Sequence, residues 1–348
     1  MRLSAFKLSV PPKLIAPYPA EHRDEARLMV IHKNTGQIEH KVFTDLLHYL
    51  GEDDSLVLND TRLLPTKLQG RKEKTAGNIE VILLRELDEQ KYFWDAQLDP
   101  ARKVRGGNKL CFGNGELVAE VLDNTTSRGR TLKFLFEGTR EELYSTIARL
   151  GTVPLPKQLK RTETLEDLVR YQTVYAQHDG ALVAPAAGLH FTAHLLKRLA
   201  LKGVNTVFIT LHTAISALNT IDIDDLVKYK VGSEPFVIPE ETASSVNKSR
   251  DSKRQICAVG ISTLKTIEAY TSLEGRLKAG KGWINRLIAP PYTFKTCKSL
   301  ITNFHLPASI PLVTTAAFGG YELIMEAYKI AIKEQYRFFV YGDAMLII

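Results

Sequence analysis

The chain has 348 residues, of which 44% are hydrophobic and 24% charged, and its formal net charge is +7. This composition excludes a disordered or low-complexity chain, and the length suits two folding units. No run approaches the ~18 apolar residues of a membrane-spanning helix, and the N-terminal segment lacks the apolar core of a secretory signal. We therefore expect a cytoplasmic protein that does not bind membranes.

The basic residues gather in three segments, 101–109, 157–161 and 247–254. A basic surface attracts polyanions at long range, which makes nucleic acid a plausible partner. Lysines spread over solvated loops would give the same pattern, so charge alone leaves both interpretations open. The three cysteines stand far apart and predict neither a disulfide framework nor a zinc knuckle.

In chain order, "DDSLVLNDTR" (53–62) predicts a buried strand that ends in polar residues. From Lys67 to about Gly138, short apolar stretches are separated by Gly, Asn and Asp, which is typical of a small β-barrel or sandwich. Later in the chain, strands alternate with helices. We therefore predict an α/β domain of residues 1–62 and 152–348, interrupted by an inserted β-barrel domain of residues 63–151.

The segment after the predicted barrel contains a candidate βαβ unit. "ALVAP" (181–185) has the composition of a buried strand, Thr192 suits the N-cap of the next helix, and Gly203 suits its C-terminal end. "NTVFITL" (205–211) should then form a neighbouring parallel strand. "RQICAVG" (254–260), followed by another helical stretch, repeats the pattern.

Two histidines follow the predicted strands of this unit. His190 lies in the loop after the first strand, and His212 comes directly after the second. Ligands of open α/β sheets bind outside the carboxyl ends of the strands, so both histidines are candidate site residues. Each could instead satisfy a loop carbonyl.

Two stretches look like known motifs, a P-loop and a zinc protease helix, but each lacks a residue that the motif needs. Residues 275–282 fit G-x-x-x-x-G-K, but Gly282 stands where a P-loop needs a hydroxyl, and the stretch follows a helix rather than a strand. His190 and His194 have the spacing of a zinc protease helix without its Glu. We predict no metal site.

Five longer stretches follow one another along the chain: "NDTRLLP" (59–65), "YQTVYA" (171–176), "GALVAPAAGLHFT" (180–192), "LITNFHLPAS" (300–309) and "YRFFVYGDAMLI" (336–347). Together they resemble the S-adenosylmethionine:tRNA ribosyltransferase-isomerase family of queuosine biosynthesis, over the whole chain. The resemblance implies a mixed-sheet α/β sandwich domain carrying an inserted β-barrel.

The resemblance also implies the reaction. The ribosyl group of S-adenosylmethionine is transferred to 7-aminomethyl-7-deazaguanine in tRNA and isomerised, which gives epoxyqueuosine and releases adenine and methionine. S-adenosylmethionine would be a co-substrate, tRNA the partner, no metal would take part, and we expect a monomer.

For such a reaction, the sulfonium acidifies the protons on ribose C5′, and a neutral imidazole, with an unperturbed pKa of ~6.5, can accept one to form an ylide. His190 or His212 is therefore the candidate base, and our hypothesis is His190. Replacing His190 with Ala should then abolish adenine release while cofactor binding stays within a few-fold.

Other polar residues receive roles from the same resemblance. Asp60, Glu234 and Asp343 could face the cationic groups and ribose hydroxyls, and arginines could bind the methionine carboxylate, although each could instead form a structural ion pair. The predicted catalytic residues are His190, His212, Asp60 and Glu234. The predicted cofactor-binding residues are Arg62, Pro185, Gly188, Phe191, Thr210, Asn303, His305, Arg337, Tyr341 and Asp343.

The chain also departs from the family pattern. The departures are Ala186, Ile261 and Val340, each without a hydroxyl that the family carries, and the runs 212–218, 229–234 and 259–268, the last with Lys265 in place of Arg. Lost hydrogen bonds to a bound polar group would cost ~1–3 kcal/mol each. Two alternatives therefore stay open: a diverged paralogue that uses S-adenosylmethionine for another reaction or acceptor, and a protein that holds tRNA or nucleotide without turnover.

Overall fold

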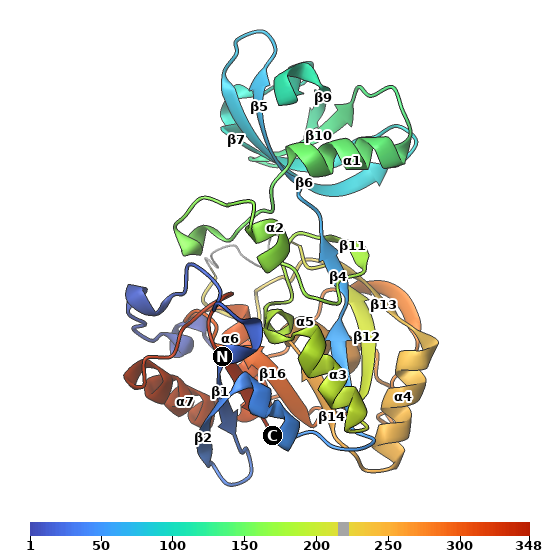
Figure 1. Cartoon of the computed structure of the whole chain (residues 1–348). Coiled ribbons are helices and arrows are strands. Elements are labelled where there is room, and N and C mark those ends of the chain that lie inside the picture. The colour runs from blue at the N-terminus through green and yellow to red at the C-terminus, as the bar shows by residue number, and fades with distance from the viewer. Residues whose placement is uncertain (215–222) are drawn as a thin grey trace.

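The computed structural model describes residues 1–214 and 223–348. These residues form a nine-stranded mixed sheet covered by helices, a closed barrel of six strands and a separate two-stranded sheet. The barrel stands at one end of the molecule, apart from the large sheet and its helices (Figure 1). The predicted fold class, a mixed-sheet α/β domain with a small β-barrel, is confirmed.

The centre of the large sheet is parallel. β3 (Ser55–Asn59) lies between β12 (Asn205–Leu211) and β14 (Ile256–Val259), and β16 (Ser299–Asn303) runs parallel to β14. Every residue of β3, β14 and β16 is buried, as expected for strands covered on both faces. The strands expected in "DDSLVLNDTR", "NTVFITL" and "RQICAVG" are thus confirmed.

Five further strands complete the sheet: β17 (Ala344–Ile347), β1 (Arg27–Ile31) and β2 (Ile38–Val42) beyond β16, and β13 (Glu234–Ile238) and β15 (Gly280–Ile284) beyond β12. β13 and β17 run antiparallel to their inner neighbours β12 and β16. They begin at the edge where the parallel strands end. Their first residues therefore lie near the usual ligand-binding edge of such a sheet.

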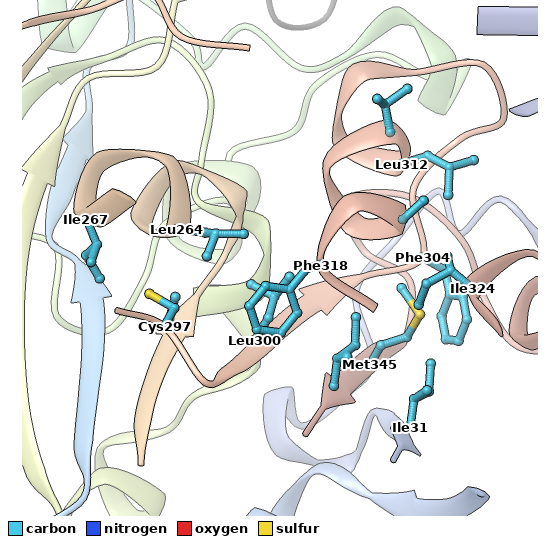
Figure 2. Close-up of a cluster of buried hydrophobic side chains, with 14 of the residues drawn as sticks. Ile31, Leu264, Ile267, Cys297, Leu300, Phe304, Leu312, Phe318, Ile324 and Met345 are labelled. Carbon is cyan, nitrogen blue, oxygen red and sulfur yellow. The ribbon is translucent and has the colours of Figure 1, made fainter. Parts of the chain in front are cut away.

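Alternate strand residues point to opposite faces of the sheet, and each face has its own core. On one face, Val57, Ala258 and Leu300 pack under four helices. These are α4 (Glu240–Asp251), α5 (Ile261–Ala269), α6 (Ile310–Gly319) and α7 (Tyr321–Lys333). Figure 2 shows side chains of this core, with Leu264 of α5 and Leu312 of α6 among those labelled.

The opposite face is covered by α3 (Ala193–Leu201) and the 3-10 helix η4 (Phe43–His48), which pack on Leu56 and Leu58. The predicted ends of α3 are confirmed. Thr192 Oγ1 accepts a hydrogen bond from the Leu195 amide at 3.0 Å, and Gly203 has φ +84° just after the helix.

The barrel strands are β5 (Lys67–Lys72), β6 (Asn78–Asp88), β7 (Phe93–Asp99), β8 (Lys109–Phe112), β9 (Leu117–Asn124) and β10 (Gly129–Phe134). They close in the order β10-β7-β6-β5-β8-β9. The helix α1 (Arg140–Leu150), which the sequence analysis did not predict, buries Leu143 and Ile147 in the barrel core. The chain enters and leaves the barrel side by side, because Lys67 and Thr152 are paired through backbone hydrogen bonds.

The prediction of a strand at 181–185 is wrong. Only Ala181 is extended, as the last residue of β11 (His178–Ala181), which pairs with β4 (Thr61–Leu63) outside the large sheet. The physical reason is that both edges of β12 are already occupied, by β3 and by β13. The rest of the segment is an irregular, buried stretch, so it does not form a βαβ unit with β12.

Short helices connect the remaining elements: η1 (Leu3–Phe6), η2 (Pro12–Leu14), η3 (Arg23–Glu25), η5 (Ala101–Lys103), η6 (Gly113–Gly115), η7 (Lys157–Leu159), α2 (Asp167–Arg170) and η8 (Ala186–His190). Among the described residues, no helix has the length and apolar character needed to cross a membrane.

Candidate active site

A cavity of about 990 Å³ lies between the barrel and the large sheet. Its volume is at the upper end of the range usual for small-molecule sites. The barrel contributes residues of β6 and β7 and of α1, including Arg85, Trp94 and Tyr144. The α/β domain contributes Gly180 and His212, among others. The cavity is therefore built by two parts of the fold that are far apart in the chain.

The sheet places most of the predicted site residues at one edge. Asp60, His212 and Asn303 lie at the carboxyl ends of β3, β12 and β16, and Glu234 and Asp343 lie where β13 and β17 begin. The edge nevertheless divides into two environments. His212 and the neighbours of Glu234 line the large cavity, whereas His190 lines a separate space of only about 20 Å³.

His212 is held in place from two sides. Its Nδ1 lies 2.7 Å from Thr61 Oγ1, and the backbone of Gly180 lies flat against its ring, so close that a Cβ there would come within 2.9 Å of ring atoms. Its Nε2 makes no hydrogen bond with any described residue. Burial lowers the pKa of His212, and the neighbouring His178 adds to this effect. The imidazole is thus neutral at pH 7, oriented, and open to the cavity.

Asp60 is a buried carboxyl next to this histidine in the fold. Thr210 Oγ1 donates to its Oδ1 at 2.7 Å, and His178 Nε2 lies 3.6 Å from Oδ2. Burial raises the pKa of Asp60, and the hydrogen bond from Thr210 partly offsets that rise. The structure therefore pairs two predicted site residues, Asp60 and Thr210, with each other.

Glu234 joins three elements. Its side chain is 5% exposed and forms an ion pair with Lys265 of α5, while Oε1 accepts a hydrogen bond from the Ala214 amide at 3.0 Å. The residues on either side of it, Ser233 and Pro235, line the cavity. Glu234 consequently fixes the backbone just after His212.

Arg62 is the exposed member of the predicted set. It lies on β4, its side chain is 55% exposed, and its Nε is 3.4 Å from Asp179 Oδ1. Asp179 lines the cavity. Arg62 is thus near the cavity, paired with one of the carboxylates in its wall.

His190 lies in the interior of the protein rather than at a strand end. Its Nε2 lies 3.2 Å from Asn303 Oδ1, and its ring is 5.0 Å from that of Phe43. Because the Asn303 amide nitrogen donates to the carbonyls of Phe339 and Val340, its oxygen is the acceptor, and His190 Nε2 carries the proton. Burial lowers the pKa of His190 to about 4.

The other predicted cofactor ligands near His190 make structural contacts. Asp343 is buried, and its carboxylate accepts the backbone amides of Arg27 (3.1 Å) and Arg337 (2.7 Å). The Arg337 guanidinium also contacts Asp343, at 3.5 Å. Tyr341 donates its hydroxyl to Asp167 at 3.0 Å. These groups hold the start of β17 in place.

Four more predicted ligands have packing roles. A Cβ on Gly188 would lie 2.1 Å from the Tyr175 hydroxyl, and Phe191 is fully buried edge-on against Phe43. Pro185 precedes η8 and is buried. His305 Nε2 lies 2.7 Å from Thr302 Oγ1, and burial lowers the pKa of His305 to about 3. None of these four lines the large cavity.

The wall of the large cavity is acidic. Five carboxylates line it, against two guanidinium groups: Glu86, Glu89, Asp95, Glu141 and Asp179, and Arg85 and Arg140. Arg140 is engaged by Glu86 at 2.7 Å and by Glu89 at 3.2 Å. This excess of negative charge lies inside a chain whose net charge is +7. The cavity therefore favours cationic ligands while the protein as a whole attracts anions.

The family model described as a queuosine biosynthesis protein matches residues 3–347. The chain belongs to this family. It is 65% identical to the S-adenosylmethionine:tRNA ribosyltransferase-isomerase of Amoebophilus asiaticus and 50% identical to that of Cytophaga hutchinsonii, with all of each chain covered. The crystal structure of S-adenosylmethionine tRNA ribosyltransferase from Thermotoga maritima is 32% identical, with a TM-score of 0.56 and coverage of 99% and 100%.

Most departures of this queuosine biosynthesis family member from the expected pattern lie away from the large cavity. Ala186 and Val340 pack in one hydrophobic cluster with Tyr341, and Ile261 packs against the main core. Lys265 pairs with Glu234 of the chain itself. In the run 212–218 only residues 212–214 are described and line the cavity, and 215–218 lie outside the described residues.

The barrel residues that line the cavity were not predicted from the sequence. The strands of β6 and β7 were expected, but nothing in their alternating pattern shows that Glu86 or Trp94 faces a second domain. Three buried polar atoms in this wall, Thr66 Oγ1, Glu86 Oε1 and Trp94 Nε1, have no hydrogen-bond partner among the described residues. Buried polar groups without a hydrogen-bond partner are rare in folded proteins, so three of them in one wall are a notable feature of the site. No group of three potential metal ligands occurs in the described part of the chain.

Proposed function

We propose that this chain is an S-adenosylmethionine:tRNA ribosyltransferase-isomerase, an enzyme of tRNA modification in queuosine biosynthesis. The observation that carries the proposal is the full-length match, at 65% identity, to a protein of that name. Two features support the proposal: an acidic cavity suits a cationic sulfonium, and a net charge of +7 suits binding to tRNA.

The finer chemistry follows from the family resemblance. The co-substrate is S-adenosylmethionine, the acceptor is the aminomethyl group of 7-aminomethyl-7-deazaguanine in tRNA, and adenine and methionine are released as epoxyqueuosine forms. An acceptor ammonium and a sulfonium are both cations, and the excess of carboxylates in the cavity wall would stabilise both. The metal-free chemistry and the cytoplasmic location stay predictions.

His212 is the better candidate for the general base. Its Nε2 has no hydrogen-bond partner among the described residues, and the ring lines a cavity large enough for a nucleoside. Thr61 and Gly180 fix the ring, and burial keeps it neutral and able to accept a proton from ribose C5′.

His190, our hypothesis from the sequence, is less suitable for this step. The space beside it, about 20 Å³, is the size of a single water molecule, and Asn303 already engages its Nε2. A pKa of about 4 also makes it a weaker base than an ordinary imidazole. We assign His190 to positioning the loop before α3.

The assay follows adenine, methionine and nucleoside mass after the protein is incubated with S-adenosylmethionine, with and without tRNA that carries the deazaguanine precursor. Adenine and methionine together with epoxyqueuosine in the tRNA digest is the expected result. Product formed without tRNA would instead indicate a paralogue with another acceptor, and no turnover would indicate a binding protein.

A further inference from the structure

Trp283 is an exposed tryptophan in the wall of the large cavity. It lies on β15, and 57% of its surface is accessible, whereas Trp94, the other tryptophan of the chain, is 4% exposed. Tryptophan exposes a large apolar ring to water at this position, at a cost in free energy unless a ligand covers it. Because Trp283 lines the cavity, a molecule bound there would cover the ring.

Trp283 and His212 share one face of the sheet. Pro235 pairs with Trp283 across β13 and β15, and its carbonyl accepts the His212 amide at 3.1 Å. Directly paired residues of neighbouring strands point to the same face. Two strand spacings separate Trp283 from His212, about 10 Å. A ring stacked on Trp283 could therefore extend a substituent toward the imidazole.

Arg85 faces the same ring from the barrel. Its Cζ lies 5.9 Å from the centroid of the Trp283 ring, near the outer limit of a cation–π contact. Arg85 is an exposed side chain of β6, so it can swing away by the small distance needed to admit a flat group. Two planar groups, one on each domain, then enclose a slot at the cavity.

We propose that Trp283 is the stacking platform for the acceptor nucleobase of the tRNA, with Arg85 covering the opposite face of that base. This inference rests on the proposed function, since it assigns a subsite of the same cavity. A base that undergoes chemistry must leave its stack, and every nucleobase offers a π-face to an aromatic ring. The acidic wall beside the slot suits the aminomethyl ammonium of the expected base.

The position of Trp283 favours the acceptor base over the adenine of S-adenosylmethionine as the group that stacks on it. Trp283 is more than half exposed, on the sheet's edge strand, which suits a group that arrives on a macromolecule. The co-substrate must instead place its C5′ atom within reach of His212 Nε2, deeper in the wall. The two assignments predict different kinetic effects, and the experiment separates them.

The experiment compares Trp283→Ala, Trp283→Phe and a control, Leu273→Ala, with the wild-type chain. Leu273 is 88% exposed and does not line the cavity, so its replacement tests the loss of a large exposed side chain elsewhere. The affinity for precursor tRNA is measured by filter binding without S-adenosylmethionine. KM values for both substrates come from the adenine-release assay.

We expect Trp283→Ala to weaken tRNA binding and raise its KM roughly 5- to 150-fold, the range for loss of one stacked base, with the KM for S-adenosylmethionine changed less than about twofold. Trp283→Phe should recover most of the affinity, and Leu273→Ala should match the wild type. A raised KM for S-adenosylmethionine alone would assign the ring to adenine, and unchanged constants would remove Trp283 from the site; either result overturns the inference. A different outcome concerns the proposed function alone: the wild-type chain binds tRNA, Trp283→Ala weakens this binding, and neither protein turns over S-adenosylmethionine. That result would contradict the proposed function and leave the stacking role of Trp283 intact.

Discussion

The two histidines of the candidate site have opposite environments, although they stand in similar sequence contexts. His212 is oriented by Thr61 and lines a large cavity, with its Nε2 free of hydrogen bonds to the described residues, whereas His190 is enclosed and donates to Asn303. In both residues burial lowers the pKa of the imidazole, to about 4 in His190. The same residue type thus lines a large cavity in one place and packs in the interior in the other.

This difference predicts opposite effects of two alanine variants. His212→Ala should reduce adenine release by at least about 100-fold, the usual loss for a general base, with little change in Tm. His190→Ala should lower stability by about 2–4 kcal/mol, because it leaves a cavity and an unpaired Asn303 oxygen. Turnover and thermal denaturation measure the two effects. His194→Ala, at an exposed position of α3, is the matched control. Full activity in His212→Ala would assign the base elsewhere.

The pKa of His190 also predicts how stability depends on pH. The folded pKa of about 4 lies below the unfolded value of ~6.5, so the unfolded chain binds more protons between these values. The contribution is fully present above pH 6.5 and is lost as pH falls toward 4, by about 3 kcal/mol. His305, with a pKa of about 3, acts in the same direction.

Urea titrations between pH 4 and pH 7 test this dependence. The variant His190→Gln keeps a donor for Asn303 without a titrating ring, so its stability should fall less over the same interval. An identical pH dependence in wild type and variant would show that other groups are responsible.

At the scale of elements, the Glu234–Lys265 pair joins β13, α5 and the backbone after His212. Both side chains are largely buried, at 5% and 16% exposure. Such a pair contributes little net stability but is costly to break, because one charge is left buried and alone.

Lys265→Met should therefore destabilise the protein by about 3 kcal/mol, measured as a lower urea midpoint. Lys265→Arg, which keeps the charge and matches the expected family residue, is the control and should stay close to wild type. Equal stability of Lys265→Met and wild type would contradict this prediction and show that breaking the ion pair costs nothing.

In the molecule as a whole, the charge distribution predicts that binding of tRNA and binding of S-adenosylmethionine respond differently to salt. The net charge is +7, yet the cavity wall carries more carboxylates than guanidinium groups. Phosphate contacts release counterions and depend steeply on salt, while a single enclosed cation depends on it weakly.

We therefore expect the KM for tRNA to rise roughly tenfold or more between 50 and 200 mM KCl, and the KM for S-adenosylmethionine to change less than about twofold. Initial rates with each substrate varied in turn measure both constants. A KM for tRNA that does not respond to salt would contradict a binding surface built on basic residues. Light scattering on the same samples would test the expected monomer.

The sequence predicted those features that depend on neighbouring residues. The apolar runs of β3, β12 and β14, the Thr192 cap and the glycine after α3 are all local patterns, and the structure confirms them. The strand at 181–185 failed for a non-local reason, since its buried, apolar composition gives no sign that the edges of β12 are taken by β3 and β13.

Local patterns were therefore enough to predict the family, an α/β fold with a β-barrel, and the strand ends that carry Asp60 and His212, but not the barrel residues that complete the cavity wall. Which side chains face the cavity depends on how the elements pack, because the contacts that orient them join distant parts of the chain. Thr61 and His212 are 151 residues apart, and His190 and Asn303 are 113 apart. Periodicity reports whether a residue is buried, but the neighbour that buries it is set by how the elements pack.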